Sequence, residues 1–153
     1  MARIRKDPLC CGPPSDKVND MPKTVLIVDD SMFMLATIKA KLDRIGLLLC
    51  IEKAGDGRIA LEKIRSGYTP DLIITDMNMP NIGGIELVKA IRAMPKLHFT
   101  PIIAMAEESS AAKRDEGKKV GVTAWLVKPV NTLELVAVTR YVLPGAIRVA
   151  QSQ

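Results

Sequence analysis

The residues of this chain whose types and spacing could do chemistry are three aspartates that follow apolar segments. Asp29 and Asp30 come directly after residues 25–28, Val-Leu-Ile-Val, and Asp76 comes directly after residues 72–75, Leu-Ile-Ile-Thr. Carboxylates gathered at strand ends repel one another strongly unless a cation lies among them. Mg²⁺ prefers such oxygen ligands and serves phosphate chemistry. The pattern therefore predicts a divalent metal site suited to phosphoryl groups.

The segments that must position these aspartates alternate between strand and helix patterns. Strands are expected at residues 24–28, 48–53, 71–75, 100–105 and 123–127. Between them apolar residues recur at helical spacing, and the expected buried faces are Leu35, Ile38, Leu42 and Ile45; Ile85, Val88, Ile91 and Met94; and Leu133, Val136 and Tyr141. Runs this apolar suit parallel strands that are covered on both faces. The sequence therefore predicts an α/β fold of five βα units.

The joins between these elements carry two further predictions. Gly46, Gly67 and Gly121 each follow a helical segment, where a residue with positive φ can end the helix. Segment 107–120 is so rich in charged residues that little apolar face remains. We expect this helix to pack loosely and to move readily.

Composition limits the domain organisation and the class of partner. The chain has 153 residues, 48% of them apolar, which fits one domain at residues 23–143 with a flexible leader at 1–22 and a short tail at 144–153. No apolar stretch approaches the length needed to cross a bilayer, and the N-terminus does not resemble a secretory signal. The net charge of +5 is not gathered into a basic cluster, so neither nucleic-acid binding nor membrane insertion is expected. Three cysteines do not form a disulfide framework, which favours a cytoplasmic protein.

A family resemblance emerges from the order of the motifs, which are Asp29-Asp30, Asp76, Met79-Pro80, Gly84 and Lys128-Pro129. In this combination the chain resembles the receiver domain (CheY-like) of two-component response regulators. The resemblance implies a flavodoxin-like (βα)5 three-layer sandwich whose parallel sheet has the strand order 2-1-3-4-5. It implies a signalling domain rather than an enzyme, which at most catalyses its own phosphorylation and dephosphorylation. Ligands in such sheets bind where the strand order reverses, at the strands that carry the aspartates.

The resemblance also implies a role for each site residue. Asp76 is expected to accept a phosphoryl group from a histidine kinase or a histidine phosphotransfer protein. Mg²⁺ is expected to bind Asp30 and Asp76 directly, Asp29 through water, and the main-chain carbonyl of Asn78. Lys128 is expected to pair with the phosphoryl group, in preference to a solvated lysine. Helix capping before residue 31 is the competing interpretation of the first two aspartates.

The chain departs from the family pattern after the fourth strand. Ala106 stands where receivers carry a Thr or Ser that binds the phosphoryl group, and Glu107 stands where they carry a small residue. Ala106 and Trp125 occupy the positions of the family's conformational switch, although Trp125 fits equally well as a packed strand aromatic. Asn78 and Glu108 occupy positions that tune dephosphorylation. A natural atypical receiver, an engineered alanine and a slipped strand register each explain Ala106.

Three functions follow as hypotheses. The main one is a single-domain response regulator that signals by docking a downstream protein through the face formed by residues 107–143. A pseudo-receiver that docks partners constitutively is the alternative that Ala106 suggests. A Mg²⁺-dependent phosphohydrolase with an aspartate nucleophile is the third, although Asn78 stands where such enzymes place an acid-base aspartate.

Overall fold

A five-stranded parallel sheet forms the centre of the protein. The computed structural model describes residues 22–44, 46, 48–108 and 110–143, and the leader and tail that the sequence predicts lie almost wholly outside them. The strands are β1 (Lys23–Val28), β2 (Leu49–Ala54), β3 (Leu72–Asp76), β4 (Ile102–Ala106) and β5 (Ala124–Val127). Their spatial order is β2-β1-β3-β4-β5. Every strand prediction is confirmed to within two residues at each end, and so is the strand order that the family resemblance implies.

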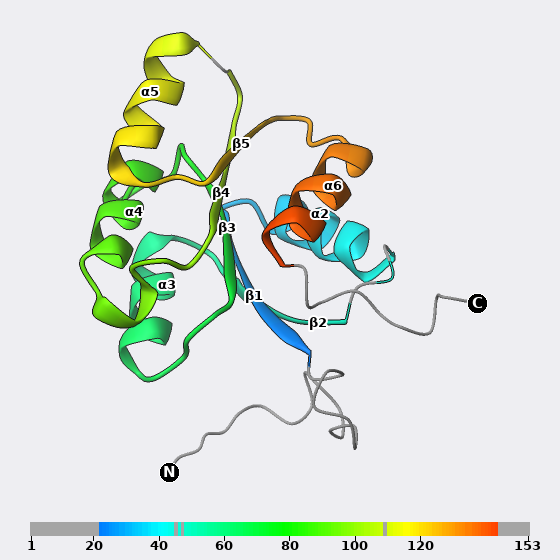
Figure 1. Ribbon diagram of the computed structural model, residues 1–153, viewed down its shortest axis with the longest axis horizontal. Coiled ribbons are helices and arrows are strands. Elements are labelled where there is room, and N and C mark those ends of the chain that lie inside the picture. The colour runs from blue at the N-terminus through cyan, green and yellow to red at the C-terminus, as the bar shows by residue number, and fades with distance from the viewer. Residues whose placement is uncertain (1–21, 45, 47, 109, 144–153) are drawn as a thin grey trace.

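Helices cover both faces of this sheet in three layers. The helices α2 (Met32–Arg44) and α6 (Thr132–Val142) lie on one face, whereas α3 (Gly57–Arg65), α4 (Gly84–Arg92) and α5 (Ala111–Val120) lie on the other (Figure 1). A short 3₁₀ helix, η2 (Pro95–Leu97), follows α4. Two apolar clusters fill the spaces between the sheet and each helical layer. The α/β class and the layered architecture are therefore as predicted.

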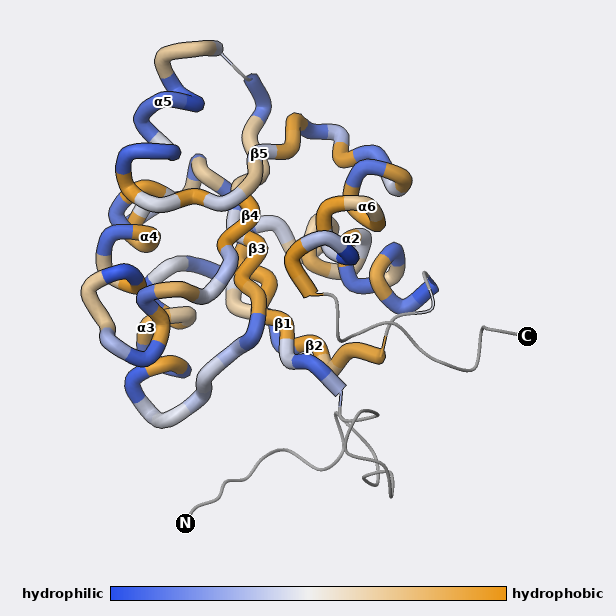
Figure 2. Tube along the Cα trace, in the orientation of Figure 1, coloured by the Kyte–Doolittle hydropathy of each residue, from blue (hydrophilic) through white to orange (hydrophobic). Residues whose placement is uncertain are grey.

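The strands are apolar because both of their faces are buried. All five residues of β3 and all five of β4 are buried, and the strands appear as the apolar centre of the molecule in Figure 2. Parallel sheets covered by helices on both faces show this pattern of continuous rather than alternating hydrophobicity. In the register of the sheet, Val28 of β1 pairs with Thr75 of β3, and Asp76 pairs with Met105 of β4. This register brings the ends of β1, β3 and β4 to one rim.

The joins confirm the predicted glycine positions. Gly46, Gly67 and Gly121 have φ values of 78°, 116° and 110°, a region that side chains with a Cβ atom rarely enter. Helix α5 is largely hydrophilic along its length in Figure 2, and Gly117 is its one buried residue. It begins at Ala111 rather than near residue 107, because the Ser110 hydroxyl accepts a hydrogen bond from the Lys113 N–H and caps it there.

One sequence prediction was wrong in part. Of the α6 residues predicted to be buried, Leu133 and Tyr141 are exposed, at 79% and 84%, and Val136 is partly buried, whereas Leu135 and Thr139 are buried. This helix is apolar on several sides, so periodicity gave the spacing of the buried residues but not their phase. The prediction for the cysteines concerns Cys10 and Cys11 as well as Cys50, and the first two lie outside the described residues. Within the described ranges, no helix is long and apolar enough to cross a membrane.

Candidate functional site

Three carboxylates meet at the rim where β1 and β3 end. Asp29 and Asp30 follow β1, Asp76 is the last residue of β3, and carboxylate oxygens of all three lie within 4.8 Å of one another. Asp29 and Asp76 are buried, at 1% and 3% exposure, while Asp30 is exposed. The structure therefore brings together the three aspartates that the sequence singled out. It leaves one of them open to solvent.

Backbone hydrogen bonds orient the two buried carboxylates. The Ser31 N–H donates to Oδ1 of Asp29 at 2.9 Å, and the Asn78 N–H donates to Oδ1 of Asp76 at 3.2 Å. The hydroxyl of Ser31 accepts a hydrogen bond from the Met34 N–H and so caps helix α2. Because Ser31 makes this cap, helix capping does not account for the two aspartates. The role of Ser31 was missed in the sequence, although a serine just before a helix is a recognised capping signal.

Lys128 supplies the positive charge of the site. It follows β5, and its Nζ atom lies 3.2 Å from Oδ1 of Asp76 and 3.4 Å from Oδ2 of Asp29. Burial lowers the pKa of Lys128, but the neighbouring carboxylates of Asp76 and Asp29 outweigh burial and raise it above its ordinary value. The peptide bond between Lys128 and Pro129 is cis. Lys128 therefore stays charged and sits between the two buried aspartates.

The donor set fits a hard divalent cation. Burial raises the pKa of Asp29, and the nearby charge of Asp76 adds to this, while hydrogen bonds from Ser31 and the charge of Lys128 oppose it. Three carboxylates next to a single lysine leave the cluster with excess negative charge. Oxygen ligands that combine two buried groups with one exposed group suit Mg²⁺, which retains several waters. The residues therefore match the cation that the sequence predicts.

The end of β4 lies beside this cluster. Ala106 is the last residue of β4, is 3% exposed, and its carbonyl accepts a hydrogen bond from the Lys128 N–H at 2.7 Å. The strand register pairs Ala106 with Val127 of β5. Ala106 therefore lies at the same rim as Lys128. Glu107 follows it and is exposed.

Trp125 connects β5 to the segment after β4. Its indole N–H donates to the main-chain carbonyl of Glu108 at 3.3 Å, and the Glu108 carboxylate pairs with Lys113 of α5 at 3.2 Å. A Cβ atom on Gly117 of α5 would come within 2.9 Å of the Trp125 ring, so the ring packs closely under that helix. The sequence did not predict the hydrogen bond to Glu108, because it joins residues 17 positions apart.

A glycine also shapes the segment after Asp76. A Cβ atom on Gly84 would lie 2.6 Å from Cα of Met77 and 2.8 Å from the carbonyl oxygen of Asp76. The Gly84 N–H donates to the Met77 carbonyl at 3.2 Å. The absence of a side chain at residue 84 thus allows α4 to begin in contact with the main chain that follows the buried carboxylate.

Comparison with known proteins agrees with this geometry. Residues 25–140 match the model of the response regulator receiver domain. The chain is 37% identical over 105 residues to the chemotaxis protein CheY of Pseudomonas aeruginosa, across 69% of this chain and 83% of that protein. It is 38% identical over 105 residues to CheY1 of Helicobacter pylori, across 69% of this chain and 84% of that protein.

Solved structures show the same relationship in three dimensions. The chemotaxis protein CheY4 of Vibrio cholerae superimposes with a TM-score of 0.74 at 42% identity, covering 80% of this chain and 99% of that chain. A putative response regulator from Chloroflexus aurantiacus has a TM-score of 0.74 at 29% identity, covering 80% and 98%. The sequence match, the strand order and the acidic rim agree, and the chain belongs to the CheY-like response regulator receiver domains.

Proposed function

We propose that Asp76 accepts a phosphoryl group from a phosphohistidine of a histidine kinase or a histidine phosphotransfer protein. The observation that carries this proposal is that the two oxygens of the Asp76 carboxylate differ in their bonding partners. Its Oδ1 atom is engaged by Lys128 Nζ and by the Asn78 N–H, each at 3.2 Å. Among the described residues, no hydrogen bond to Oδ2 is found, and the nearer oxygen to Lys128 Nζ is Oδ1. One oxygen is thus held in place while the other is available to attack.

The transfer exchanges one bond to phosphorus for another. A carboxylate oxygen of Asp76 bonds to phosphorus, and the N–P bond of the phosphohistidine breaks with its electron pair returning to the imidazole. Aspartyl phosphates are established covalent intermediates of this kind. Lys128 is already placed against the Asp76 carboxylate, so its ammonium can pair with the incoming phosphoryl oxygens.

Mg²⁺ completes the proposed site. Asp30 and Asp76 would bind the ion directly, Asp29 through water, and Asn78 through its main-chain carbonyl. When bound, the cation offsets the charge that the cluster and the phosphoryl oxygens share, which is most of what phosphoryl transfer requires. The exposure of Asp30 supports this assignment, because the ion and its waters then reach the cluster from solvent.

The signal would pass by docking rather than by turnover of a substrate. Phosphorylation shifts a two-state population, and the shift is limited by how differently the phosphoryl group contacts each state. We place the docking face on α5, β5 and α6, within residues 107–143, where the largely exposed α5 is the element that we expect to move. Asn78 and Glu108 are the residues we propose to tune dephosphorylation; both are exposed and so have access to the attacking water.

A cytoplasmic location is also part of the proposal. The similarity to chemotaxis CheY proteins supports this location. Fractionation of cells that express the full chain tests it. We expect the chain in the cytosolic fraction, and recovery in the membrane or secreted fraction would reject the cytoplasmic assignment.

Phosphorylation by a small donor tests the proposed function. The full chain is incubated with acetyl phosphate and Mg²⁺, and intact-mass spectrometry measures the fraction that gains one phosphoryl group. We expect labelling that is lost in Asp76→Asn and when EDTA replaces Mg²⁺. Labelling that persists in either control would reject the assignment of Asp76 or of the metal.

The alternative, a pseudo-receiver that docks partners constitutively, is favoured by Ala106. This residue brings no hydroxyl to the rim, and among the described residues no other hydroxyl replaces it beside Lys128 in a hydrogen bond. The same experiment separates the two functions. A pseudo-receiver gains no phosphoryl group from acetyl phosphate, even at saturating Mg²⁺.

A further inference from the structure

Methionines gather around the acidic rim of this protein. Met32 opens helix α2 two residues after Asp30, Met77 directly follows Asp76, and Met79 comes two residues later. The sulfur of a thioether is a nucleophile that peroxides oxidise to a sulfoxide, and methionine sulfoxide reductases reverse this reaction. The rim therefore holds side chains that a reversible oxidation could modify.

Solvent exposure separates these methionines. Met32 is 83% exposed, Met77 and Met79 are partly buried, and Met105, which pairs with Asp76 in the sheet, is fully buried. Met79 packs against the apolar cluster beneath α3 and α4, whereas Met77 belongs to neither apolar cluster of the described residues. Because oxidation requires access of the oxidant to the sulfur, Met77 is the methionine beside the phosphoacceptor that a dissolved peroxide can reach.

The sulfur of Met77 lies against the start of helix α4. A Cβ atom on Gly84 would overlap Sδ of Met77 and would lie 2.6 Å from the Met77 Cα. The Gly84 N–H also donates to the Met77 carbonyl at 3.2 Å. Both the side chain and the main chain of Met77 therefore contact the first residue of α4. An oxygen added to the side of the sulfur that faces Gly84 has no room unless these two segments move apart.

The start of α4 also offers partners to a sulfoxide. The first N–H groups of a helix have no acceptor within the helix, and within the described residues no hydrogen bond from the N–H of Ile85 or Glu86 is found. Thioether sulfur is a weak acceptor, whereas a sulfoxide oxygen carries negative charge and accepts strongly. Oxidation of Met77 thus exchanges an apolar contact with α4 for a polar one.

A shift of Met77 reaches the phosphoacceptor through the main chain. The Met77 N–H donates to the Met105 carbonyl at 2.9 Å, and the Asn78 N–H donates to Oδ1 of Asp76 at 3.2 Å. Since Met77 lies between Asp76 and Asn78, its displacement disturbs the hydrogen bond that orients the carboxylate. Misplacing a reacting group by about 1 Å can lower a rate by about 100-fold.

We propose that Met77 is a site of reversible oxidation through which a peroxide switches off phosphorylation of Asp76. A lone pair of Sδ attacks one oxygen of hydrogen peroxide, the O–O bond breaks, and the products are the sulfoxide and one molecule of water. The inference rests on the proposed phosphorylation of Asp76 and adds a regulator of that same site. Oxidation leaves Asp76 chemically unaltered, so a reductase restores the active form.

Treatment of the full chain with hydrogen peroxide tests the inference. All samples, treated and untreated, are then incubated with dithiothreitol, which restores reversibly oxidised thiols but leaves methionine sulfoxide, and peptide mapping measures the sulfoxide at each methionine. Acetyl phosphate, Mg²⁺ and intact-mass spectrometry give the rate of labelling. We expect a rate about tenfold lower when residue 77 is fully oxidised, and recovery after treatment with methionine sulfoxide reductases A and B.

Three leucine variants locate the effect. Leucine has nearly the volume of methionine but no sulfur, and this exchange usually costs little stability. After peroxide, we expect Met77→Leu to keep the rate of its own untreated sample. Met32→Leu and Met79→Leu should lose as much rate as the unaltered chain, because each keeps the sulfur of residue 77.

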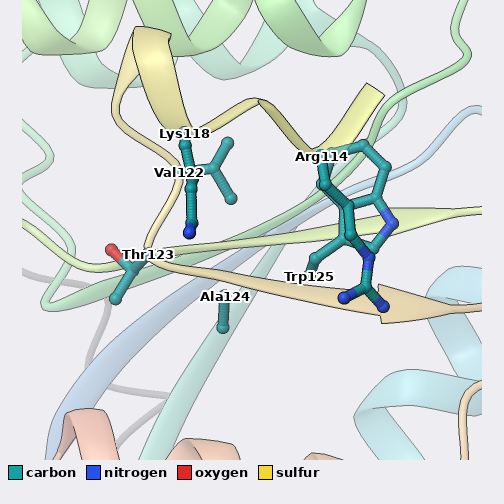
Figure 3. Close-up of a pocket in the computed structure, with 6 residues that line it drawn as sticks. All are labelled: Arg114, Lys118, Val122, Thr123, Ala124 and Trp125. Atoms are coloured by element: carbon teal, nitrogen blue, oxygen red, sulfur yellow. The ribbon is translucent and has the colours of Figure 1, made fainter. Parts of the chain in front are cut away.

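Oxidation of Trp125, the only tryptophan of the chain, is measured separately. Figure 3 shows Trp125 beside Arg114 in the pocket between α5 and β5, and among the described residues no methionine lines that pocket. An unchanged mass of the peptide that contains Trp125 excludes its oxidation as the cause of a lower rate. The Met77→Leu variant supplies the same control, because it retains Trp125.

Hydrogen exchange at the start of α4, followed by NMR, does not depend on phosphorylation. We expect slower exchange of the Ile85 and Glu86 N–H groups in the oxidised chain and no change in Met77→Leu. Three results would overturn the inference: no sulfoxide at residue 77 when Met32 is fully oxidised, full labelling despite that sulfoxide, or an equal loss of rate in Met77→Leu. If the untreated chain takes no label, the proposed phosphorylation itself has failed, and unchanged exchange at residues 85 and 86 would then also reject the sulfoxide switch.

Discussion

The substitution Ala106→Thr tests whether the missing hydroxyl weakens the response to phosphorylation. Residue 106 ends β4, is buried, and its carbonyl is bonded to the Lys128 N–H at 2.7 Å. A hydroxyl added there stands at the rim where Asp76 would carry phosphate. We expect phosphorylated Ala106→Thr to change conformation more completely than the unaltered phosphorylated protein.

The size of this effect follows from one charge-assisted hydrogen bond. Such bonds contribute about 1.5–3 kcal/mol, and a free-energy difference of that size changes a two-state equilibrium by roughly 10- to 150-fold. Ala106→Val is the matched control, because valine has nearly the shape of threonine but no hydroxyl. Both variants insert atoms at a buried position, which costs about 1–3 kcal/mol of folding stability, so their difference isolates the hydroxyl.

Fluorescence of Trp125 and hydrogen exchange in α5 report the response. Each protein is measured before and after saturating acetyl phosphate and Mg²⁺, with the phosphorylated fraction determined by intact mass. We expect a larger fluorescence change and a larger change in α5 hydrogen exchange for the threonine variant than for the valine variant or the unaltered chain. This expectation would be refuted if the threonine and valine variants, phosphorylated to the same extent, responded equally.

Three further predictions concern stability, and chemical denaturation in EDTA measures each. Gly84→Ala should lower the free energy of unfolding by about 1–3 kcal/mol, because the added Cβ would meet the Met77 main chain at 2.6 Å. Arg92→Met should cost about 1–3 kcal/mol, because Arg92 donates two hydrogen bonds to the Gly121 carbonyl, at 3.2 and 2.8 Å. Asp29→Asn should stabilise the metal-free protein at neutral pH. Burial raises the pKa of Asp29 above its ordinary 3.8, so its charged form is penalised above the raised pKa and the penalty disappears below pH 3.8.

Each of these predictions has its own control. Gly83→Ala is the partner of Gly84→Ala, because its Cβ would lie 3.8 Å from the nearest atom, and equal losses at both glycines would contradict the packing argument. For Arg92, the control is Arg92→Lys, which keeps the positive charge but not the two hydrogen bonds to Gly121. If Arg92→Lys loses little stability, the charge rather than these two bonds explains the loss in Arg92→Met. For Asp29, the gain from Asn should shrink as the pH falls, and a gain that is constant with pH would exclude titration of Asp29 as its cause.

The strands could be predicted because burial on both faces requires continuous apolar residues, whereas their order followed only from the family resemblance. Residues 72–74 and 102–105 are continuous apolar runs, and both lie in fully buried central strands. The buried face of α6 could not be predicted in the same way. Leu133 and Leu135 are both apolar, and only packing against the sheet and α2 decides that Leu135 is inside and Leu133 outside.

The site was predictable where its residues follow strands directly. Asp29, Asp30 and Asp76 converge because parallel strands end at the same rim. Contacts between segments distant in sequence were not predictable, such as the Trp125 indole bonded to the Glu108 carbonyl. No local pattern encodes such a bond, because it depends on how Glu108 and helix α5 pack against β5.

The most direct test of the acidic rim is calorimetric titration of the metal-free chain with Mg²⁺. Our account predicts binding of one ion per chain, lost or strongly weakened in Asp76→Asn and in Asp30→Asn. The control Asp43→Asn removes an exposed aspartate of α2 that pairs with Lys39 and should bind Mg²⁺ like the unaltered chain. No heat of binding, or equal binding by all four proteins, would contradict a magnesium site formed by these carboxylates.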